Sequence, residues 1–316
     1  MEKTSITALL SAFVRAYHAK NETHPVFNDF AAGSLLTDEE YKQIADYILS
    51  GADFFAPGKK DAFQSDNELL SYIVNTQLAP TPLCRAAYAE SALETEIRTG
   101  AEQYVILGAG LDSFALRGKE FLKTHYVYET DRPAVQRDKI ARLTRAFRSR
   151  GESLPKNLRF VSVDFSADDL AEKLTASGFN AAKKTFFSWL GVTYYLTEQA
   201  FEHTLETLSR LCAEGSAVVF DIPDENYFAA SEQRVKNTIA LAAAGGEKMQ
   251  RGYSYAETEA ILERHGFLIY EYLTPDDVQK NIIDARGADM RAFEHTAYVL
   301  TVKKAFNRAL STRPPR

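Results

Sequence analysis

The stretch that most constrains the fold is a short apolar run that stops at a glycine turn. Residues 104–107 favour a strand, and Gly108, Ala109 and Gly110 follow directly. Such a run is typical of a buried parallel strand, and glycines let the next backbone pass close to a ligand because no Cβ intervenes. Ligands of open α/β sheets bind at the carboxyl ends of the strands, so this turn is the predicted site of a nucleotide-like cofactor.

Acidic residues near the turn indicate which cofactor is expected. Glu129 lies near the end of a second predicted strand, about 20 residues after Gly108, where a ribose-binding carboxylate is expected. Asp112 follows the turn, and Ser113 stands where the dinucleotide fingerprint has its third glycine. A carboxylate repels a pyrophosphate but attracts an ammonium or a sulfonium. These residues favour S-adenosylmethionine over a dinucleotide, with an NAD(P)-dependent oxidoreductase as the alternative.

Arg85 lies on the predicted helix that leads into the central strand. One interpretation is a surface arginine paired with Glu90 or Glu94. The other is a cation that holds the carboxylate of the cofactor, which a guanidinium binds in a bidentate manner. Local reasoning leaves both open.

The order of the predicted elements indicates an α/β fold. Helices are expected over 4–20, from a start at 37–40 through 41–48, and over 68–78 and 83–99. Strands are expected over 104–107, 125–130, 158–163, 185–190, 217–222, 267–273 and 297–303. Helices lie between most of the strands, including one with Ser166 as its N-cap. We therefore expect an N-terminal helical cap (1–100) on an α/β core (101–316), with an insertion over 224–252 that could act as a lid.

Composition narrows the class of protein and its partners. The chain has 316 residues, 37 basic and 43 acidic, with a net charge of −6, which argues against nucleic acid as a partner. The arginines among residues 142–150 are interpreted as solvent-exposed side chains at the C-terminal end of a helix, where the helix dipole favours positive charge. Cys84 and Cys212 form no disulfide framework, and neither a signal peptide nor a membrane span is apparent. A cytoplasmic protein that does not bind membranes is expected.

Several segments together resemble the leucine carboxyl methyltransferase family of class I S-adenosylmethionine-dependent methyltransferases, and most closely its bacterial small-molecule O-methyltransferase branch. They include 104–117 (YVILGAGLDSFALR), 127–139 (VYETDRPAVQRDK), 160–170 (FVSVDFSADDL), 186–197 (FFSWLGVTYYLT) and 214–223 (EGSAVVFDIP). The resemblance implies a Rossmann-like, mostly parallel sheet whose last strand is antiparallel.

The resemblance also implies roles for individual residues. Arg85 would pair with the cofactor carboxylate, and Glu129 would accept hydrogen bonds from both ribose hydroxyls. Asp164 and Phe165 would frame the adenine. The remaining expected cofactor contacts are Gly108, Ala109, Gly110, Asp112, Thr130 and Ser188. The family usually has a glutamate where this chain has Leu190, so one cofactor contact is either missing or supplied elsewhere, for example by Ser188 or a backbone carbonyl.

The predicted activity is methyl transfer to a carboxylate or hydroxyl oxygen of a small metabolite, such as a polyketide or peptide natural product. A carboxylate acceptor needs no base, whereas a hydroxyl needs one nearby. The catalytic candidates are Tyr195, which could orient the acceptor oxygen, and His18 and His24 in the cap. No metal-ligand spacing is present. The substitution at Leu190 also leaves open a non-catalytic S-adenosylmethionine-binding protein.

Overall fold

The computed structural model describes residues 6–165 and 167–305. A single seven-stranded sheet has the order β3-β2-β1-β4-β5-β7-β6. The strands are β1 (Gln103–Leu107), β2 (Tyr126–Asp131), β3 (Leu158–Ser162), β4 (Thr185–Trp189), β5 (Ala217–Pro223), β6 (Phe267–Leu273) and β7 (Thr296–Lys303). In this sheet β7 pairs antiparallel with both β5 and β6, between which it lies, and the remaining strand pairs are parallel. The predicted α/β fold is confirmed.

The order of the strands places the ligand-binding edge. From β1 the chain runs outward to β2 and β3, and then returns to β4 on the other side of β1. The topological switch point therefore lies between β1 and β4. The glycine turn after β1 opens at this point, as the sequence predicts.

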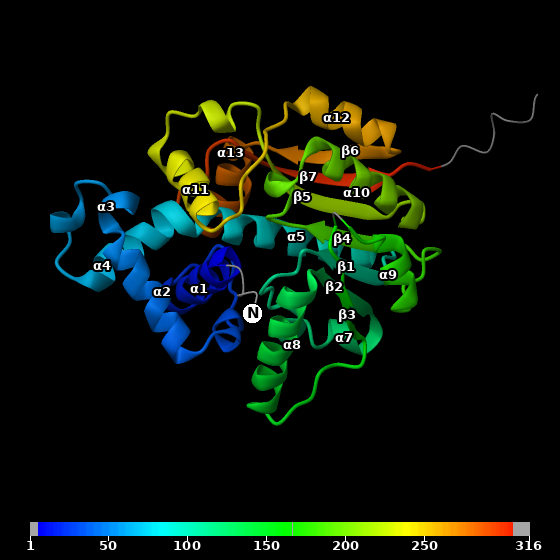
Figure 1. The fold of residues 1–316 in the computed structure, drawn as a ribbon, viewed down its shortest axis with the longest axis horizontal. Coiled ribbons are helices and arrows are strands. Elements are labelled where there is room, and N and C mark those ends of the chain that lie inside the picture. The colour runs from blue at the N-terminus through cyan, green and yellow to red at the C-terminus, as the bar shows by residue number, and fades with distance from the viewer. Residues whose placement is uncertain (1–5, 166, 306–316) are drawn as a thin grey trace, which may run out of the picture.

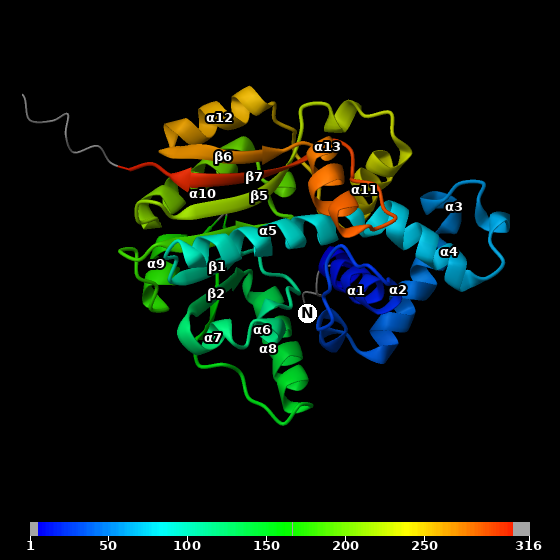
Figure 2. The ribbon, with the colours of Figure 1, turned by 180° about the vertical axis from the view of Figure 1, so that it is seen from behind.

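Helices cover both faces of the sheet because successive strand residues alternate between them. Tyr104 and Ile106 pack in the core that contains residues of α5 (Pro80–Arg98) and α8 (Pro133–Arg148). Val105 and Leu107 pack on the opposite face, against α9 (Leu170–Ala176), α10 (Glu198–Leu211) and α12 (Tyr255–Arg264). Figure 1 shows these elements, and α5 crosses in front of the sheet in Figure 2.

The chain before β1 is helical. Its elements are α1 (Ile6–Asn21), η1 (Ala32–Leu35), α2 (Asp38–Ser50), α3 (Ala52–Phe55), η2 (Lys60–Ala62), α4 (Asp66–Ile73) and the π-helix η3 (Val74–Leu78). The last five residues of the helix predicted over 68–78 therefore form the π-helix η3 and not a continuation of α4. The next helix, α5, begins at Pro80 and not at residue 83, because proline is tolerated in a first helical turn. In both views of the molecule this region lies at one end of the sheet, beside α11 (Gln233–Ala244).

Between β5 and α12 the insertion folds on itself. It contains η5 (Tyr227–Ala229) and α11, and its own small core includes Val235, Ala242 and Met249, packed with Tyr194 and Phe293. The shorter elements elsewhere are α6 (Phe114–Arg117), α7 (Phe121–Thr124), η4 (Thr193–Tyr195), α13 (Pro275–Val278), η6 (Gln279–Ile283) and η7 (Asp284–Arg286).

Some sequence predictions about local structure need correction or fall outside the described residues. Helix α9 begins at Leu170 and is capped by Asp169, whereas the predicted N-cap Ser166 lies outside the described residues. Within 6–165 and 167–305, no helix is long and apolar enough to cross a membrane, and Cys84 and Cys212 are buried free thiols.

The arginines at the end of α8 attach the N-terminal helices to the sheet. The guanidinium of Arg142 donates to both carboxylate oxygens of Glu40, each at 2.7 Å, and to the carbonyl of Leu35 at 2.8 Å. Arg145 donates to the same carbonyl at 3.2 Å. The interpretation of these residues as a solvated helix end is therefore wrong for Arg142, whose side chain is only 8% exposed.

Replacing Arg142 with alanine is expected to lower the free energy of unfolding by about 2–4 kcal/mol, because it removes the bidentate donor of the Glu40 carboxylate and one of the two donors of the Leu35 carbonyl. The Arg142 hydrogen bond lowers the pKa of Glu40 from 4.5 to about 2. The contribution of Glu40 is thus fully present above pH 4.5 and is lost as the pH falls toward 2. Urea denaturation near neutral and acidic pH tests both effects, with the exposed Arg148→Ala as the control.

Candidate active site

A cavity of about 780 Å³ opens at the carboxyl ends of β1, β2 and β4. Its walls come from the glycine turn, α1, α5, the segment after β4 and residues 246–250 of the insertion. We call the lining from the sheet edge and α5, which carries Arg85, Asp112, Asp131 and Asp164, the charged half. We call the lining from α1 and residues 241–250 the apolar half, because it carries Leu10, Val14, Leu241 and Met249, although Arg15, Glu247 and Lys248 also lie there. Elements distant in the sequence therefore enclose one site at the predicted edge of the sheet.

The glycine turn needs glycine for two reasons. Gly108 and Gly110 have φ of 70° and 45°, which side chains disfavour. A Cβ at Gly108 would lie 2.5 Å from Cγ2 of Val192. The turn is fixed to β2, because the amide of Ala109 donates to the carbonyl of Thr130 at 2.8 Å. Gly108, Ala109 and Gly110 all line the cavity.

The acidic group of β2 that faces the cavity is Asp131 and not Glu129. Asp131 lines the cavity and accepts the Gly110 amide on Oδ2 at 2.6 Å. Glu129 is fully buried, 2.8 Å from the Lys139 ammonium, and does not line the cavity. Thr130 is also buried, and its hydroxyl donates to the Ile106 carbonyl. The physical reason is the register: β1 pairs with β2 only as far as Thr130, so Asp131 is the first residue beyond that pairing.

Arg85 lines the cavity and is held from behind by a buried carboxylate. Its Nη1 lies 3.0 Å from Oδ2 of Asp221, which is completely buried at the end of β5. Asp221 also accepts the Gly191 amide at 2.6 Å and the Tyr194 hydroxyl at 3.1 Å. The alternative pairing of Arg85 with Glu90 is wrong, because Glu90 binds Arg117 at 2.6 and 2.7 Å.

The remaining predicted cofactor residues also reach the cavity. Asp112, Asp164, Phe165 and Ser188 line it, and so does Leu190. Asp112 accepts the amide of Phe114 at 2.6 Å, which fixes its carboxylate beside the turn. The Ser188 hydroxyl lies 2.8 Å from that of Tyr104.

Of the three catalytic candidates, only Tyr195 lines the cavity. Burial raises the pKa of Tyr195 to about 12, so its phenol is neutral near pH 7 and can donate a hydrogen bond. His18 is buried, and its Nε2 accepts the amide of Val26 at 3.0 Å. Burial lowers the pKa of His18. Its neutral imidazole is used in this hydrogen bond with the backbone of Val26. His24 is exposed. Neither histidine lines the cavity, so the structure does not support either as an acceptor-side base.

Sequence reasoning missed Glu247, which lines the apolar half of the cavity. Its Oε2 accepts the hydroxyl of Thr7 at 2.6 Å, so residues 246–250 touch α1 across the cavity. The other groups in this half are mainly apolar side chains, among them Leu10, Val14, Leu241, Met249 and Phe293.

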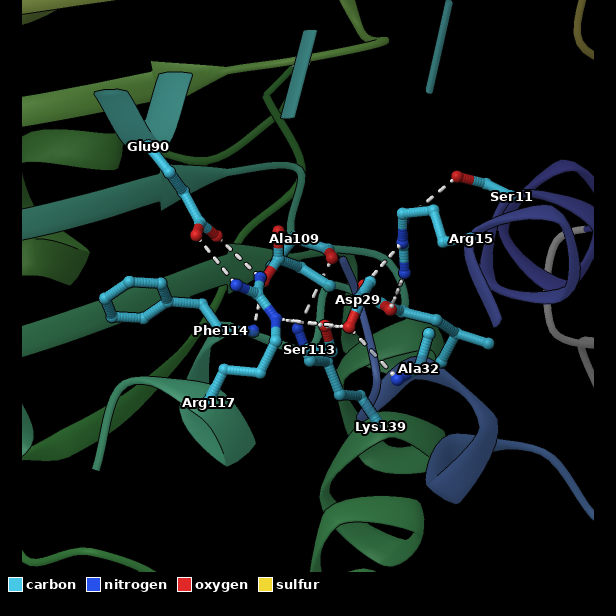
Figure 3. A network of polar contacts seen from close by, with 12 residues as sticks. Ser11, Arg15, Asp29, Ala32, Glu90, Ala109, Ser113, Phe114, Arg117 and Lys139 are labelled. Atoms are coloured by element: carbon cyan, nitrogen blue, oxygen red, sulfur yellow. Dashed lines mark hydrogen bonds and ion pairs between the residues drawn. The ribbon is translucent and has the colours of Figure 1, made fainter. Parts of the chain in front are cut away.

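A buried ionic network joins α1 to the glycine turn (Figure 3). Arg15 of α1 donates to Asp29 at 2.9 Å and to the carbonyl of Leu111 at 2.6 Å. The Ser113 hydroxyl donates to Asp29 at 2.5 Å, and Arg117 lies 3.1 Å from the same carboxylate. The helix that covers the cavity is therefore held in a fixed place relative to the turn.

The donor set fits S-adenosylmethionine. An arginine for a carboxylate, an acidic residue beside the turn for a ribose and a carboxylate with an aromatic ring for an adenine lie around one cavity. No cluster of His, Cys, Asp or Glu suited to a metal ion occurs among residues 6–165 and 167–305.

Comparisons with known proteins agree with this geometry. The model of the leucine carboxyl methyltransferase family matches residues 8–209. A Bacillus subtilis protein named "Putative S-adenosyl-L-methionine-dependent methyltransferase YktD" is 39% identical over 96% of this chain and 99% of its own. A Mycolicibacterium paratuberculosis protein named "Putative S-adenosyl-L-methionine-dependent methyltransferase" is 30% identical over 88% of this chain and 84% of its own.

Among solved structures, a protein of the DUF574 family from Streptomyces avermitilis matches with a TM-score of 0.51. It is 16% identical and covers 82% of this chain and 95% of its own, a likeness of fold alone. The family match rejects the NAD(P)-dependent oxidoreductase considered above. The chain therefore belongs to the leucine carboxyl methyltransferase family of S-adenosylmethionine-dependent methyltransferases.

Proposed function

We propose that this methyltransferase transfers a methyl group to an oxygen of a small, largely apolar metabolite. The observation that carries the proposal is the division of one cavity into a charged half beside the glycine turn and an apolar half beneath α1 and residues 246–250. S-adenosylmethionine supplies an electrophilic methyl group on a sulfonium. The residues of the chain bind that cofactor, orient the acceptor and exclude water.

In the charged half, Arg85 would hold the cofactor carboxylate, because Asp221 aims its guanidinium and leaves other donors for the cavity. We assign the ribose hydroxyls to Asp131 in place of Glu129. Asp164 and Phe165 would hold the adenine. Asp112 would face the cationic side of the cofactor.

In the apolar half, burial favours an acceptor of low polarity. Stripping water from the acceptor oxygen raises its nucleophilicity. Tyr195 would donate a hydrogen bond to that oxygen. Glu247 offers a carboxylate to receive the proton of a hydroxyl acceptor, whereas a carboxylate acceptor needs no such group. The acidic balance of the chain disfavours nucleic acid as the substrate, and we place the protein in the cytoplasm, away from membranes.

Product analysis tests the function directly. The protein is incubated with S-adenosylmethionine that carries a deuterated methyl group and with a fractionated cell extract, and labelled products are identified by mass spectrometry. We expect the label on an ester or ether oxygen of a small molecule. Label only on nitrogen, or only in the RNA or protein fraction, would contradict the proposal. Tight cofactor binding without any turnover would indicate a non-catalytic binding protein.

With an acceptor identified, Glu247→Gln separates the two acceptor classes. For a hydroxyl acceptor, kcat should rise with pH toward neutrality and should fall by about 100- to 10,000-fold in the variant, the usual contribution of a general base. For a carboxylate acceptor, kcat should be nearly flat above about pH 6, because the acceptor is already ionised. Glu225→Gln is the control, since Glu225 is an exposed glutamate of the same insertion and does not line the cavity.

A further inference from the structure

Beneath the glycine turn lies a buried charge pair to which the proposed chemistry assigns no role. The side chains of Glu129 and Lys139 are 0% and 1% exposed, and Nζ lies 2.8 Å from Oε2. Among the described residues, the Lys139 ammonium is the cation that pairs with the Glu129 carboxylate. Burying two charges costs several kcal/mol each, so such a pair is weak evidence of a purely stabilising role.

The lysine also touches the cofactor turn. Its ammonium donates to the carbonyl of Ala109 at 3.3 Å, as Figure 3 shows. The amide of Ala109 donates to Thr130 on the opposite side, and the next amide donates to Asp131. The peptide groups at Ala109 are thus fixed by β2 on one side and by α8 on the other.

We propose that Lys139, held in place by Glu129, is a positioning residue for the cofactor: it fixes the glycine turn through Ala109 and puts a positive charge beside Asp131. The inference rests on the cofactor assignment of Asp131 but not on the identity of the methyl acceptor. Neither side chain lines the cavity, so both act through the turn.

The charges around the pair give the proposal an electrostatic consequence. Glu129 faces Lys139, Asp112 and Asp131, while Asp131 faces Lys139 and Arg132. Burial raises the pKa of Asp131, and the amides of Gly110 and Arg132 and then the ammonium of Lys139 oppose that shift. Without Lys139, the pKa of Asp131 should rise further. Because the ionised form accepts hydrogen bonds from both ribose hydroxyls, affinity should then increase with pH.

Calorimetric titration with S-adenosylhomocysteine tests the proposal without any acceptor. Lys139→Met should weaken binding by about tenfold or more, the effect of one lost charged hydrogen bond. Its affinity should also increase with pH more steeply than that of the wild type. Arg137→Met, which removes an exposed charge from the same helix, should bind as the wild type does.

The double variant Glu129→Gln/Lys139→Met separates positioning from stability. It removes the uncompensated carboxylate that Lys139→Met leaves buried, so it should regain thermal stability relative to that variant even if the single variant folds poorly. It should not regain affinity, because Ala109 still lacks its donor. A double variant that binds S-adenosylhomocysteine within about twofold of the wild type would overturn the proposal.

Discussion

Replacing Arg85 with alanine is expected to weaken the binding of S-adenosylhomocysteine by about 2–4 kcal/mol, or roughly 30- to 1,000-fold. The variant removes the proposed donor for the cofactor carboxylate and also leaves Asp221, which is completely buried, without its cation. Calorimetric titration gives the affinity, and thermal denaturation reports separately on the fold.

The control for this prediction comes from the same helix. Arg98 of α5 is exposed, its side chain donates to the Thr95 hydroxyl at 3.1 Å, and it does not line the cavity, so Arg98→Ala should leave affinity unchanged. An Arg85→Ala variant that folds and binds within about twofold of the wild type would show that the carboxylate is held elsewhere.

The second large effect is expected at Gly108. The methyl group of alanine would lie 2.5 Å from Cγ2 of Val192, and the residue would keep a φ of 70° that side chains disfavour. The turn must shift, and displacements of about 1 Å in a site cost about 100-fold. We expect binding of S-adenosylhomocysteine to fall by about this factor.

Two further variants isolate the cause. Gly151 has the same φ of 70°, but a Cβ there would meet nothing within 4 Å, so Gly151→Ala carries the backbone strain without the clash. It should bind S-adenosylhomocysteine as the wild type does. Gly108→Ala combined with Val192→Ala should recover much of the affinity. No recovery in this double variant would mean that the close approach to Val192 is not the cause.

Features encoded locally in the sequence could be predicted well. The sheet could be predicted from the apolar run before Gly108 and from the alternation of strands and helices. Apolar periodicity and glycine positions reflect local backbone preferences, which the sequence encodes directly. The turn, Asp112, Asp164 and Phe165 all reach one cavity because they follow the carboxyl ends of neighbouring parallel strands.

The choice between Glu129 and Asp131 depended on register. The two residues are two apart and point to the same side of β2, so periodicity cannot separate them. The two residues differ because β1 pairs with β2 only as far as Thr130 and because Lys139 of α8 pairs with Glu129. Both differences arise from tertiary contacts, which local sequence patterns do not encode.

Contacts between distant parts of the chain were also beyond local reasoning. Asp221 holds Arg85 from 136 positions away, and Glu247 meets Thr7 from 240 positions away. His18 was favoured for its place in the N-terminal helices, but its imidazole accepts the amide of Val26 and does not face the acceptor. Only the folded arrangement reveals these partners.

We expect the cavity after β1 to bind S-adenosylmethionine, with Asp131 on the ribose. Calorimetric titration of the wild type, Asp131→Asn and Glu129→Gln with S-adenosylhomocysteine, and of the wild type with NADH, tests this assignment. The wild type should have one S-adenosylhomocysteine site and should not bind NADH. Asp131→Asn should lose affinity by at least about tenfold, and Glu129→Gln by less. Binding of NADH without S-adenosylhomocysteine, or an Asp131→Asn variant as tight as the wild type, would contradict it.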